Sequence, residues 1–190
     1  MTAPAQRRAS CSATAEADLT ALPELDRAQA DAFWARYCAS TDRDPRRSIY
    51  TAFDCFGDSV ELADELIDLV INGPKRATAG SIGSYEADGT GVPNAGDEWI
   101  AADGRGAPRA VIRATEVRIG PLSSVDDAFA WDEGEGDRSR DYWLRAHTEF
   151  FERYHAALGI PFHPDIDVAF ERFEVAYSEP PAASVATPNS

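Results

Sequence analysis

The order of helix-like and strand-like segments is the feature that most limits what this chain can fold into. Apolar residues recur at helical spacing in three stretches, which begin near Asp26, Asp58 and Tyr142. Strand-like segments stand among them, at Trp99–Ala102, Arg109–Arg118 and Val168–Tyr177. Because the two kinds come in a mixed order and not as a regular βαβ series, we expect an α+β fold. Its sheet should be largely antiparallel and able to curl into a small barrel.

Local signals indicate where the helices begin and end. Asp26 is expected to cap the first helix. Asp58 and Glu61 have the spacing of a capping box for the second helix, and Gly73 is expected as its left-handed C-terminal cap. Residues 83 to 98, which hold several glycines and Pro93, predict a loop.

The second half of the chain adds a short helix, an acidic loop and a long helix. The short helix is expected to start at Ser123 or Ser124 and to run through Trp131. The acidic loop covers residues 132 to 137, and Asp137 or Ser139 can cap the helix that follows. That helix is expected to end near Gly159.

The length of 190 residues and the 44% hydrophobic share are enough for one domain with its own core. Residues 1 to 22 and 179 to 190 are rich in small residues, polar residues or proline, so they offer little to bury. We therefore expect a single domain over residues 23 to 178 between two disordered tails.

The charge balance limits the partners. The chain has 33 acidic and 18 basic residues, for a net charge of -15, and such a field repels phosphate. Long duplex nucleic acid is therefore not expected, because it is bound through clusters of basic side chains. No apolar run approaches the length of a membrane span, and the N-terminus does not resemble a signal peptide. With three irregularly spaced cysteines, the chain is expected to be cytoplasmic and not to enter a membrane.

Motifs for common cofactors are missing from the sequence. The three histidines are poorly spaced for zinc, and there is no Cys-x-x-Cys pair. The glycines form neither a dinucleotide fingerprint nor a phosphate loop, and no Gly-x-Ser-x-Gly elbow is present. We predict a protein with no metal site and no cofactor.

The best candidate for chemistry is the segment Gly73–Thr78, in which Lys75 and Thr78 stand three residues apart just past a helix. A lysine whose pKa is lowered by burial can activate a threonine as nucleophile, and a protonated lysine can stabilise an oxyanion. Spacing alone also fits a surface lysine that complements a helix end. His147, beside Trp143 on a helix, is more typical of a packed histidine than of a base.

A series of motifs in order resembles the ASCH domain family. It runs through Phe56-Gly57-Asp58-Ser59, Glu61–Leu66, Gly73-x-Lys75-x-x-Thr78, Ser84-Tyr85-Glu86, Gly96-Asp97, Ala110–Val117, Glu133–Ser139, Tyr142-Trp143 and His147. The likeness extends from about Tyr50 to Tyr177. It implies a PUA-like fold, a small mixed or antiparallel β-barrel with flanking α-helices and a cleft beside Lys75. The added N-terminal helical segment and Arg76, where many relatives have a small polar residue or threonine, depart from the pattern.

The family includes amidohydrolases that remove an acetyl group from N4-acetylcytidine. Carried over by position, their catalytic set is Lys75, Thr78 and Glu135. Glu133 is the alternative to Glu135 if the loop alignment slips, although we expect Glu133 to point to solvent. Around this set we expect four substrate-binding residues: Arg76, Ser81, Tyr85 and Arg138. The resemblance thus implies a small hydrolase acting on a modified pyrimidine nucleoside through a Lys/Thr/Glu site.

Two other functions fit the resemblance. In a metal-independent ribonuclease, Lys75 would stabilise the phosphorane and Glu135 would act as the base. A non-catalytic module would only bind short single-stranded RNA. A basic groove from Lys75 through Arg76, Arg113 and Arg138 would favour RNA, whereas a closed, uncharged pocket would favour a nucleoside-like ligand.

Overall fold

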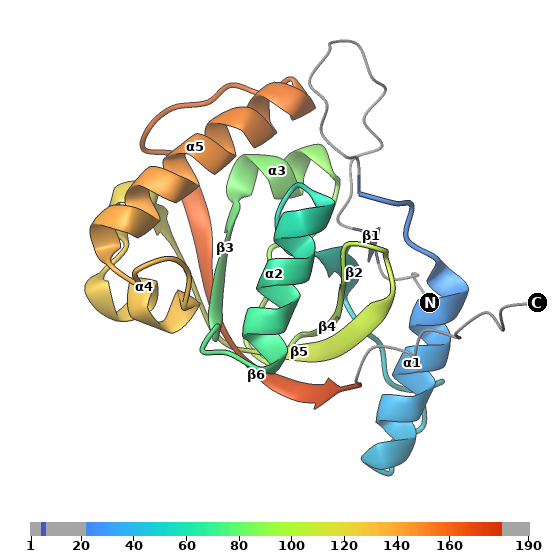
Figure 1. Ribbon diagram of the computed structural model, residues 1–190. Helices are drawn as coiled ribbons and strands as arrows, with labels where there is room; N and C mark the ends of the chain where they lie inside the picture. The colour runs from blue at the N-terminus through green and yellow to red at the C-terminus, as the bar shows by residue number, and fades with distance from the viewer. Residues whose placement is uncertain (1–4, 7–21, 180–190) are drawn as a thin grey trace, which may run out of the picture.

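The computed structural model describes residues 5–6 and 22–179, and its strands form one curled sheet (Figure 1). The pairs β1–β2 and β2–β4 are parallel, and the remaining pairs are antiparallel. The expected α+β, PUA-like fold is confirmed, as a mixed half-barrel with flanking helices. The strands in their order across the sheet are β1 (Ala5–Gln6), β2 (Ala52–Cys55), β4 (Glu98–Ala102), β5 (Pro108–Pro121), β6 (Asp167–Ser178) and β3 (Ala77–Ser81).

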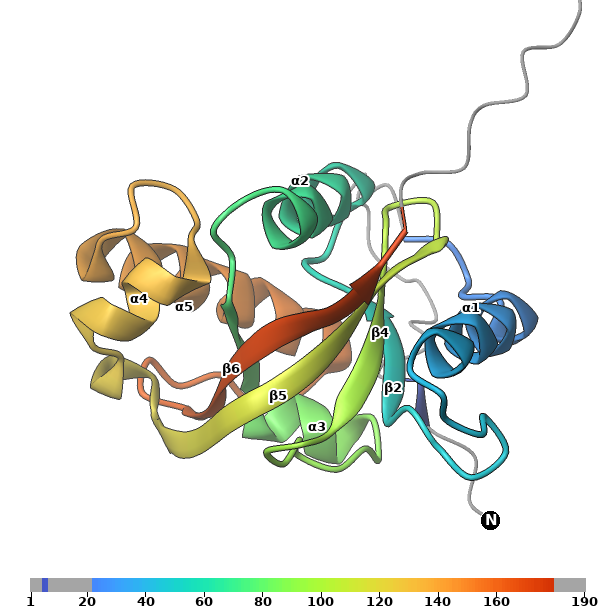
Figure 2. The ribbon, with the colours of Figure 1, turned by 90° about the horizontal axis from the view of Figure 1, so that it is seen from below.

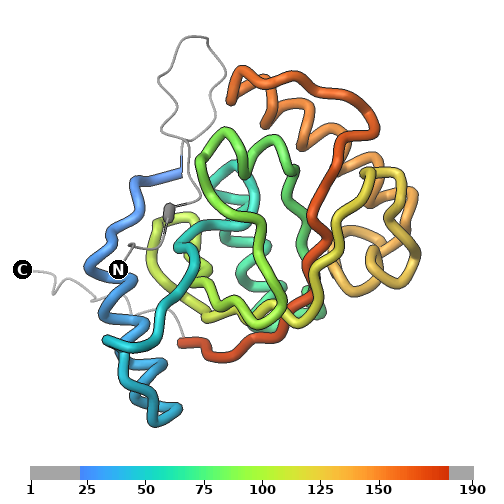
Figure 3. The backbone as a smooth tube through the Cα atoms, turned by 180° about the vertical axis from the view of Figure 1, so that it is seen from behind, coloured from blue at the N-terminus to red at the C-terminus, as the bar shows by residue number. Residues whose placement is uncertain are grey.

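The helices surround this sheet at both ends and across its middle. Helix α1 flanks β2 and β4, α2 crosses the middle, and α4 and α5 lie at the opposite end from α1 (Figures 2 and 3). The helices are α1 (Arg27–Ser40), α2 (Val60–Ile71), α3 (Ile82–Ala87), α4 (Asp127–Glu133) and α5 (Arg140–Leu158). None of these helices is both long and apolar enough to cross a bilayer.

Alternation along the strands sends side chains into separate cores on the two faces of the sheet. On β4, Trp99 packs with the α2 side chains, while its neighbour Ile100 packs under α1. On β6, Phe173 joins the α2 core, and Phe170 joins a third core with α4 and α5. The face that carries Trp99 and Phe173 is called the inner face below.

Some of the expected helix ends are confirmed, and two are wrong. The Asp26 carboxylate caps α1 by accepting from the backbone N–H of Ala28 at 2.8 Å. Helix α2 is capped by Ser59, whose hydroxyl accepts from Leu62 at 3.2 Å. The expected cap, Asp58, instead forms an ion pair with Arg153 at 3.1 Å, so the helix begins one residue later.

Gly73 is not the left-handed cap that its position suggested. The cap of α2 is Asn72, with a right-handed φ of -111°, and the backbone of Gly73 does not enter the left-handed region. A Cβ at Gly73 would lie 3.0 Å from the backbone of Leu69. Glycine is therefore required here for close packing of the chain on the helix.

The expected loop at residues 83 to 98 begins instead with helix α3, which follows strand β3 directly. The Ser81 hydroxyl starts this helix by accepting from the Ser84 N–H at 3.0 Å. The single short helix expected up to Trp131 is in fact two elements. A 3₁₀ turn covers Leu122–Ser124, and α4 begins behind its own cap, Asp126. For the long helix α5, Ser139 is the cap and Gly159 ends it with a left-handed φ of 68°.

Most of the two expected tails falls outside the described residues, which leave out 1–4, 7–21 and 180–190. Within the tails, the structure has β1 beside β2, together with Leu22 and Glu179. The Glu179 carboxylate forms an ion pair with Arg36 of α1 at 2.6 Å.

Candidate functional site

Lys75 lies in the connection between α2 and β3, and its side chain is only 1% exposed. Its backbone N–H donates to the Leu69 carbonyl at 3.1 Å, which folds the connection back over the end of α2. The ammonium Nζ lies 2.5 Å from Oε1 of Glu135 and 3.5 Å from Oε1 of Glu133. Lys75 therefore contacts both carboxylates that the sequence offered as alternatives.

Glu133 does not point to solvent as expected. It is the last residue of α4, and its side chain is 1% exposed because it turns inward between Lys75 and His147 of α5. The His147 Nε2 lies 3.3 Å from the same Oε1 that faces Lys75. Lys75, Glu133, Glu135 and His147 are called the charge cluster below.

The contacts of His147 indicate how many protons the charge cluster holds. The Nδ1 atom lies 3.1 Å from the Trp143 carbonyl, so it must carry a hydrogen, since a carbonyl only accepts. Nε2 then faces a carboxylate oxygen, and that contact needs a further proton between the two groups. The His147–Glu133 pair therefore holds an imidazolium beside a carboxylate, or a neutral imidazole beside a carboxylic acid. The ring also stacks on Trp143, with 3.8 Å between the ring centroids, and Trp143 is buried in the core.

Attraction outweighs burial for Lys75, Glu133 and His147 of the charge cluster. Burial, the largest effect on Lys75, lowers its pKa, but the charges of Glu135 and Glu133 raise that pKa above the ordinary lysine value. Burial likewise opposes charge on Glu133, but His147 and Lys75 bring its pKa below the ordinary value. The pKa of His147 is raised by Glu133 in spite of burial. Lys75 thus stays protonated near neutral pH, which argues against a lysine base and favours the oxyanion role.

Glycine in the acidic loop makes the close approach to Lys75 possible. Gly134 ends α4 with a left-handed φ of 75°, and a Cβ there would lie 2.9 Å from the backbone nitrogen of Lys75. The Arg76 N–H donates to the Asp132 carbonyl at 2.7 Å, which joins the same two segments. The run Asp132–Gly136 therefore docks on the Lys75 segment through its backbone as well as its carboxylates.

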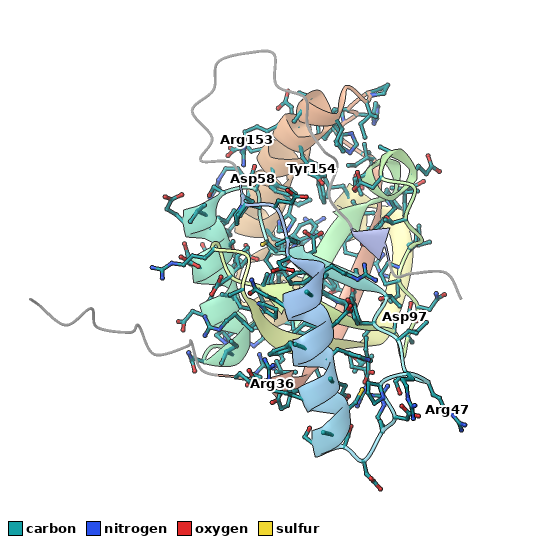
Figure 4. The ribbon with its side chains drawn as sticks, turned by 90° about the vertical axis from the view of Figure 1, so that its right-hand side faces the viewer. Arg36, Arg47, Asp58, Asp97, Arg153 and Tyr154 are labelled. Atoms are coloured by element: carbon teal, nitrogen blue, oxygen red, sulfur yellow. The ribbon has the colours of Figure 1, made fainter. Side chains whose placement is uncertain are left out.

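A cavity of about 320 Å³ lies between the end of β2, strand β3 and helices α3 and α5. Its charged groups are three carboxylates, those of Asp54, Asp58 and Asp88, and the guanidinium of Arg153. Arg153 and Asp58 pair across the cavity, from α5 to the segment before α2 (Figure 4). Six aromatic side chains also line it: Phe56, Tyr85, Trp99, Phe150, Phe151 and Tyr154.

Thr78 lines this cavity from β3, whereas Lys75 belongs to the charge cluster beside it. Phe56 connects the two places, because it lines the cavity and its ring centroid lies 5.4 Å from the Lys75 ammonium. Within residues 22–179, no hydrogen bond joins the Thr78 hydroxyl to Lys75. The structure thus brings Lys75 and Glu135 together and leaves Thr78 as a separate group on the cavity wall.

The four expected substrate-binding residues differ in where they lie. Tyr85 lines the cavity, and a side chain at Gly80 would overlap its ring. Ser81 is buried, where it caps α3 and hydrogen-bonds to His155 at 2.8 Å. The exposed Arg76 donates to two backbone carbonyls near the end of α2. The guanidinium of Arg138 donates to the Trp131 carbonyl and lies 3.7 Å from the ring centroid of that tryptophan.

Sequence reasoning missed that α5 contributes side chains both to the charge cluster and to the cavity. The sequence pattern favours His147 as a packing residue, and it assigns no site role to Phe150, Arg153 or Tyr154. The helical spacing of positions 147, 150, 151 and 154 could have placed them on one face. Nothing in the sequence says that this face turns toward β3 and the charge cluster.

Comparison with known proteins agrees with the geometry. The ASCH domain family model matches residues 52–177. The structure is similar to protein EF3133 from Enterococcus faecalis V583, at 33% identity and a TM-score of 0.70, with 78% of this chain and 88% of that one covered. It is also similar to an ASCH domain from Lactobacillus crispatus JV V101, at 30% identity and a TM-score of 0.69, covering 81% of this chain and 97% of that one. No curated protein matches. With the motif series, the curled sheet and these likenesses in agreement, the chain belongs to the ASCH domain family.

Proposed function

We propose that this protein hydrolyses the amide bond of a small N-acylated pyrimidine nucleoside, with Thr78 as the nucleophile. The observation that carries the proposal is the position of Thr78 on the wall of an aromatic cavity of about 320 Å³. Ligand pockets in proteins have volumes of about 300–1,000 Å³, so this cavity has room for a single small ligand but not for a polymer.

The side chains of the cavity support an aromatic ligand with little negative charge. Rings such as Trp99 and Tyr85 offer faces on which a base can stack. The three aspartates accept hydrogen bonds and repel phosphate, and the Arg153 guanidinium is already paired with Asp58. A nucleoside therefore fits the cavity better than a nucleotide does.

Lys75 and Glu135 take the supporting roles in this proposal. The raised pKa of Lys75 keeps its ammonium charged, so it can stabilise negative charge that develops on the carbonyl oxygen. Glu135, at 2.5 Å, holds the ammonium in place. Thr78 attacks the carbonyl carbon, the amine leaves, and water releases the acyl group from the threonine.

The arrangement of arginines gives less support to a ribonuclease or to an RNA-binding module. Arg113 is engaged by Glu98 at 2.8 Å and by Glu174 at 2.6 Å. Arg76 and Arg138 donate to backbone carbonyls. Short single-stranded RNA therefore belongs among the test substrates, as the alternative that would displace the proposal.

The test is incubation of the full chain with a panel of N-acylated nucleosides and a short RNA, with the products identified by mass spectrometry. We expect free acid and free amine from at least one nucleoside. Thr78→Val, which keeps the shape and removes the hydroxyl, should lose about 100-fold or more of this activity. Thr115→Val is the matched control, because Thr115 is exposed on β5. Cleavage of the RNA alone, or full activity in Thr78→Val, would refute the proposal.

A further inference from the structure

The proposed hydrolysis leaves the Thr78 hydroxyl in need of a base. Threonine is a weak nucleophile until a neighbouring group takes its proton. Lys75 is unsuited to this step, because two carboxylates hold it protonated. The base must come from another side chain near Thr78.

Strand pairing places a carboxylate directly opposite Thr78. Strands β3 and β6 are antiparallel, and the residue in register with Thr78 is Glu171. Residues directly opposite in an antiparallel pair project from the same face, with their Cβ atoms about 4.5–5.5 Å apart. Both side chains therefore leave the sheet on its inner face, next to each other.

A contact of Glu171 confirms the direction of its side chain. Its Oε1 accepts a hydrogen bond from Nε1 of Trp99 at 3.1 Å. Trp99 and Thr78 both line the cavity, and Glu171, which is not itself a lining residue, projects from the same face of the sheet as these two side chains. Glu171 is only 1% exposed, and a carboxylate this deep in the protein needs hydrogen-bond donors such as the Trp99 indole.

The other carboxylates near the cavity, Asp88 included, lie outside the strand register of Thr78. Asp58 pairs with Arg153, and Asp54 accepts from the Cys55 N–H at 2.8 Å. Glu133 and Glu135 belong to the charge cluster around Lys75. Only Glu171 shares a strand register with Thr78 among the described residues.

We propose that Glu171 is the general base of the site and takes the proton from the Thr78 hydroxyl as its oxygen attacks the amide carbonyl. This rests on the proposed amide hydrolysis. The new bond joins Thr78 Oγ1 to the carbonyl carbon, and the carbon–nitrogen bond breaks. Glu171 passes its proton to the departing amine. It then takes a proton from water, which attacks the acyl-threonine and releases the acid, and that proton returns to Thr78 Oγ1.

The first test uses Glu171→Gln, which removes the charge while its amide oxygen can still accept from Trp99. We expect kcat to fall about 100-fold or more, with KM and the melting temperature little changed. The matched control is Glu174→Gln on the same strand, where the side chain is 54% exposed and the charge change is identical. Thr78→Ala combined with Glu171→Gln should be no slower than Thr78→Ala alone, because the two groups serve one step.

The second test does not depend on activity. In Thr78→Cys, a neighbouring carboxylate disfavours the thiolate, so the introduced thiol should titrate at a higher pH than it does when Glu171→Gln is added. We expect a difference of about one pKa unit. It can be followed by the pH dependence of iodoacetamide labelling, read on the peptide that carries residue 78. Adding Glu174→Gln instead should leave the titration unchanged.

The outcomes separate the two proposals. If the wild type hydrolyses a nucleoside and Glu171→Gln is as fast, the role of Glu171 is overturned while the proposed function stands. If the wild type hydrolyses nothing, the proposed function fails, and the thiol titration still decides about Glu171. Equal titration with and without Glu171→Gln overturns the pairing, whereas a shift supports it.

Discussion

Glu133 and Glu135 contact the same ammonium but differ in what each would leave behind if it lost its charge. Glu133 is buried between Lys75 and His147, so Glu133→Gln removes the carboxyl group that contacts both and leaves one partly exposed carboxylate beside the buried ammonium. We expect this change to lower the free energy of unfolding by about 3–5 kcal/mol, as for other broken buried ion pairs. Glu135 is 21% exposed, so Glu135→Gln should cost only about 1 kcal/mol.

Urea unfolding of the two variants measures this difference. Equal losses of unfolding free energy in the two variants would mean that the burial of Glu133 does not matter and that water reaches both carboxylates. An activity assay on the same proteins then separates a loss of folding from a loss of chemistry, because Glu135→Gln remains folded.

His147 makes the stability of the protein depend on pH. Its pKa in the folded protein is raised by Glu133 against the effect of burial, so the folded state binds this proton more tightly than the unfolded state does. The contribution is complete below the ordinary imidazole pKa of about 6.5. It is lost as pH rises through the raised value, so stability should fall as pH increases above about 6.5.

His147→Gln should remove this dependence above about pH 6.5. His163→Gln is the control, because His163 is exposed in the segment before β6 and its loss should keep the wild-type slope. Melting temperatures over a pH series measure both variants. A slope that survives in His147→Gln would assign the dependence to another group.

For single residues, the sequence and the family resemblance indicated Lys75 and an acidic partner, but they did not predict the pairing of Glu133 with His147. A run of four carboxylates in six positions does not reveal which one turns inward. That depends on where α4 ends and on how α5 packs against it, which are contacts between distant parts of the chain. Likewise, Glu171 in a strand pattern carries no sign that Thr78 will lie opposite it.

Among the elements, the junction of α4 with the acidic loop depends on glycine. Gly134 and Gly159 both end a helix with a left-handed φ, of 75° and 68°. A Cβ at Gly159 would meet nothing within 4 Å, whereas one at Gly134 would lie 2.9 Å from the Lys75 backbone. Gly159→Ala should therefore cost only the strain of the left-handed conformation, about 1 kcal/mol.

Gly134→Ala should lower the free energy of unfolding by about 2 kcal/mol or more in addition to that strain, because two backbone segments must move apart. Thermal unfolding of the two alanine variants compares them directly. If both lose the same stability, the docking of the acidic loop on Lys75 is looser than the structure indicates.

The elements that could be predicted from the sequence are those with a long period or a clear cap. Helices α1, α2 and α5 have apolar faces, and strands β4, β5 and β6 have alternating or apolar runs. Strand β3 (Ala77–Ser81) has neither, because its small residues have little preference for strands. It becomes a strand by pairing with β6. Helix α3 has six residues, too few to show a helical period.

Across the whole molecule, the ends of the domain can be tested by truncation. The composition of residues 180 to 190 predicts that removing them leaves stability unchanged. Removing Glu179 as well breaks its ion pair with Arg36 and its hydrogen bond from the Tyr177 hydroxyl at 2.6 Å. We expect that further cut to cost about 1 kcal/mol.

Chains that end at Glu179 and at Ser178 form the matched pair for this measurement, by urea unfolding. A loss of stability on removing residues 180 to 190 alone would show that the domain continues past Glu179. Equal stability of the two truncated chains would show that the contacts of Glu179 are too solvated to contribute.

The order of strands in the sheet also determines when, during synthesis of the chain, each strand can pair with its neighbour. The sheet neighbour of β3 is β6, and their paired residues lie about 90 positions apart in the chain. A ribosome that has made Thr78 must still add nearly half of the protein before β6 can pair with it. Throughout that time residues 77–81 lack the partner that makes them a strand, and incompletely folded chains are those that bind chaperones or associate with other chains. The pairing of β3 with β6 therefore cannot form until nearly the whole domain has been made, so a message cut short before β6 yields no complete sheet.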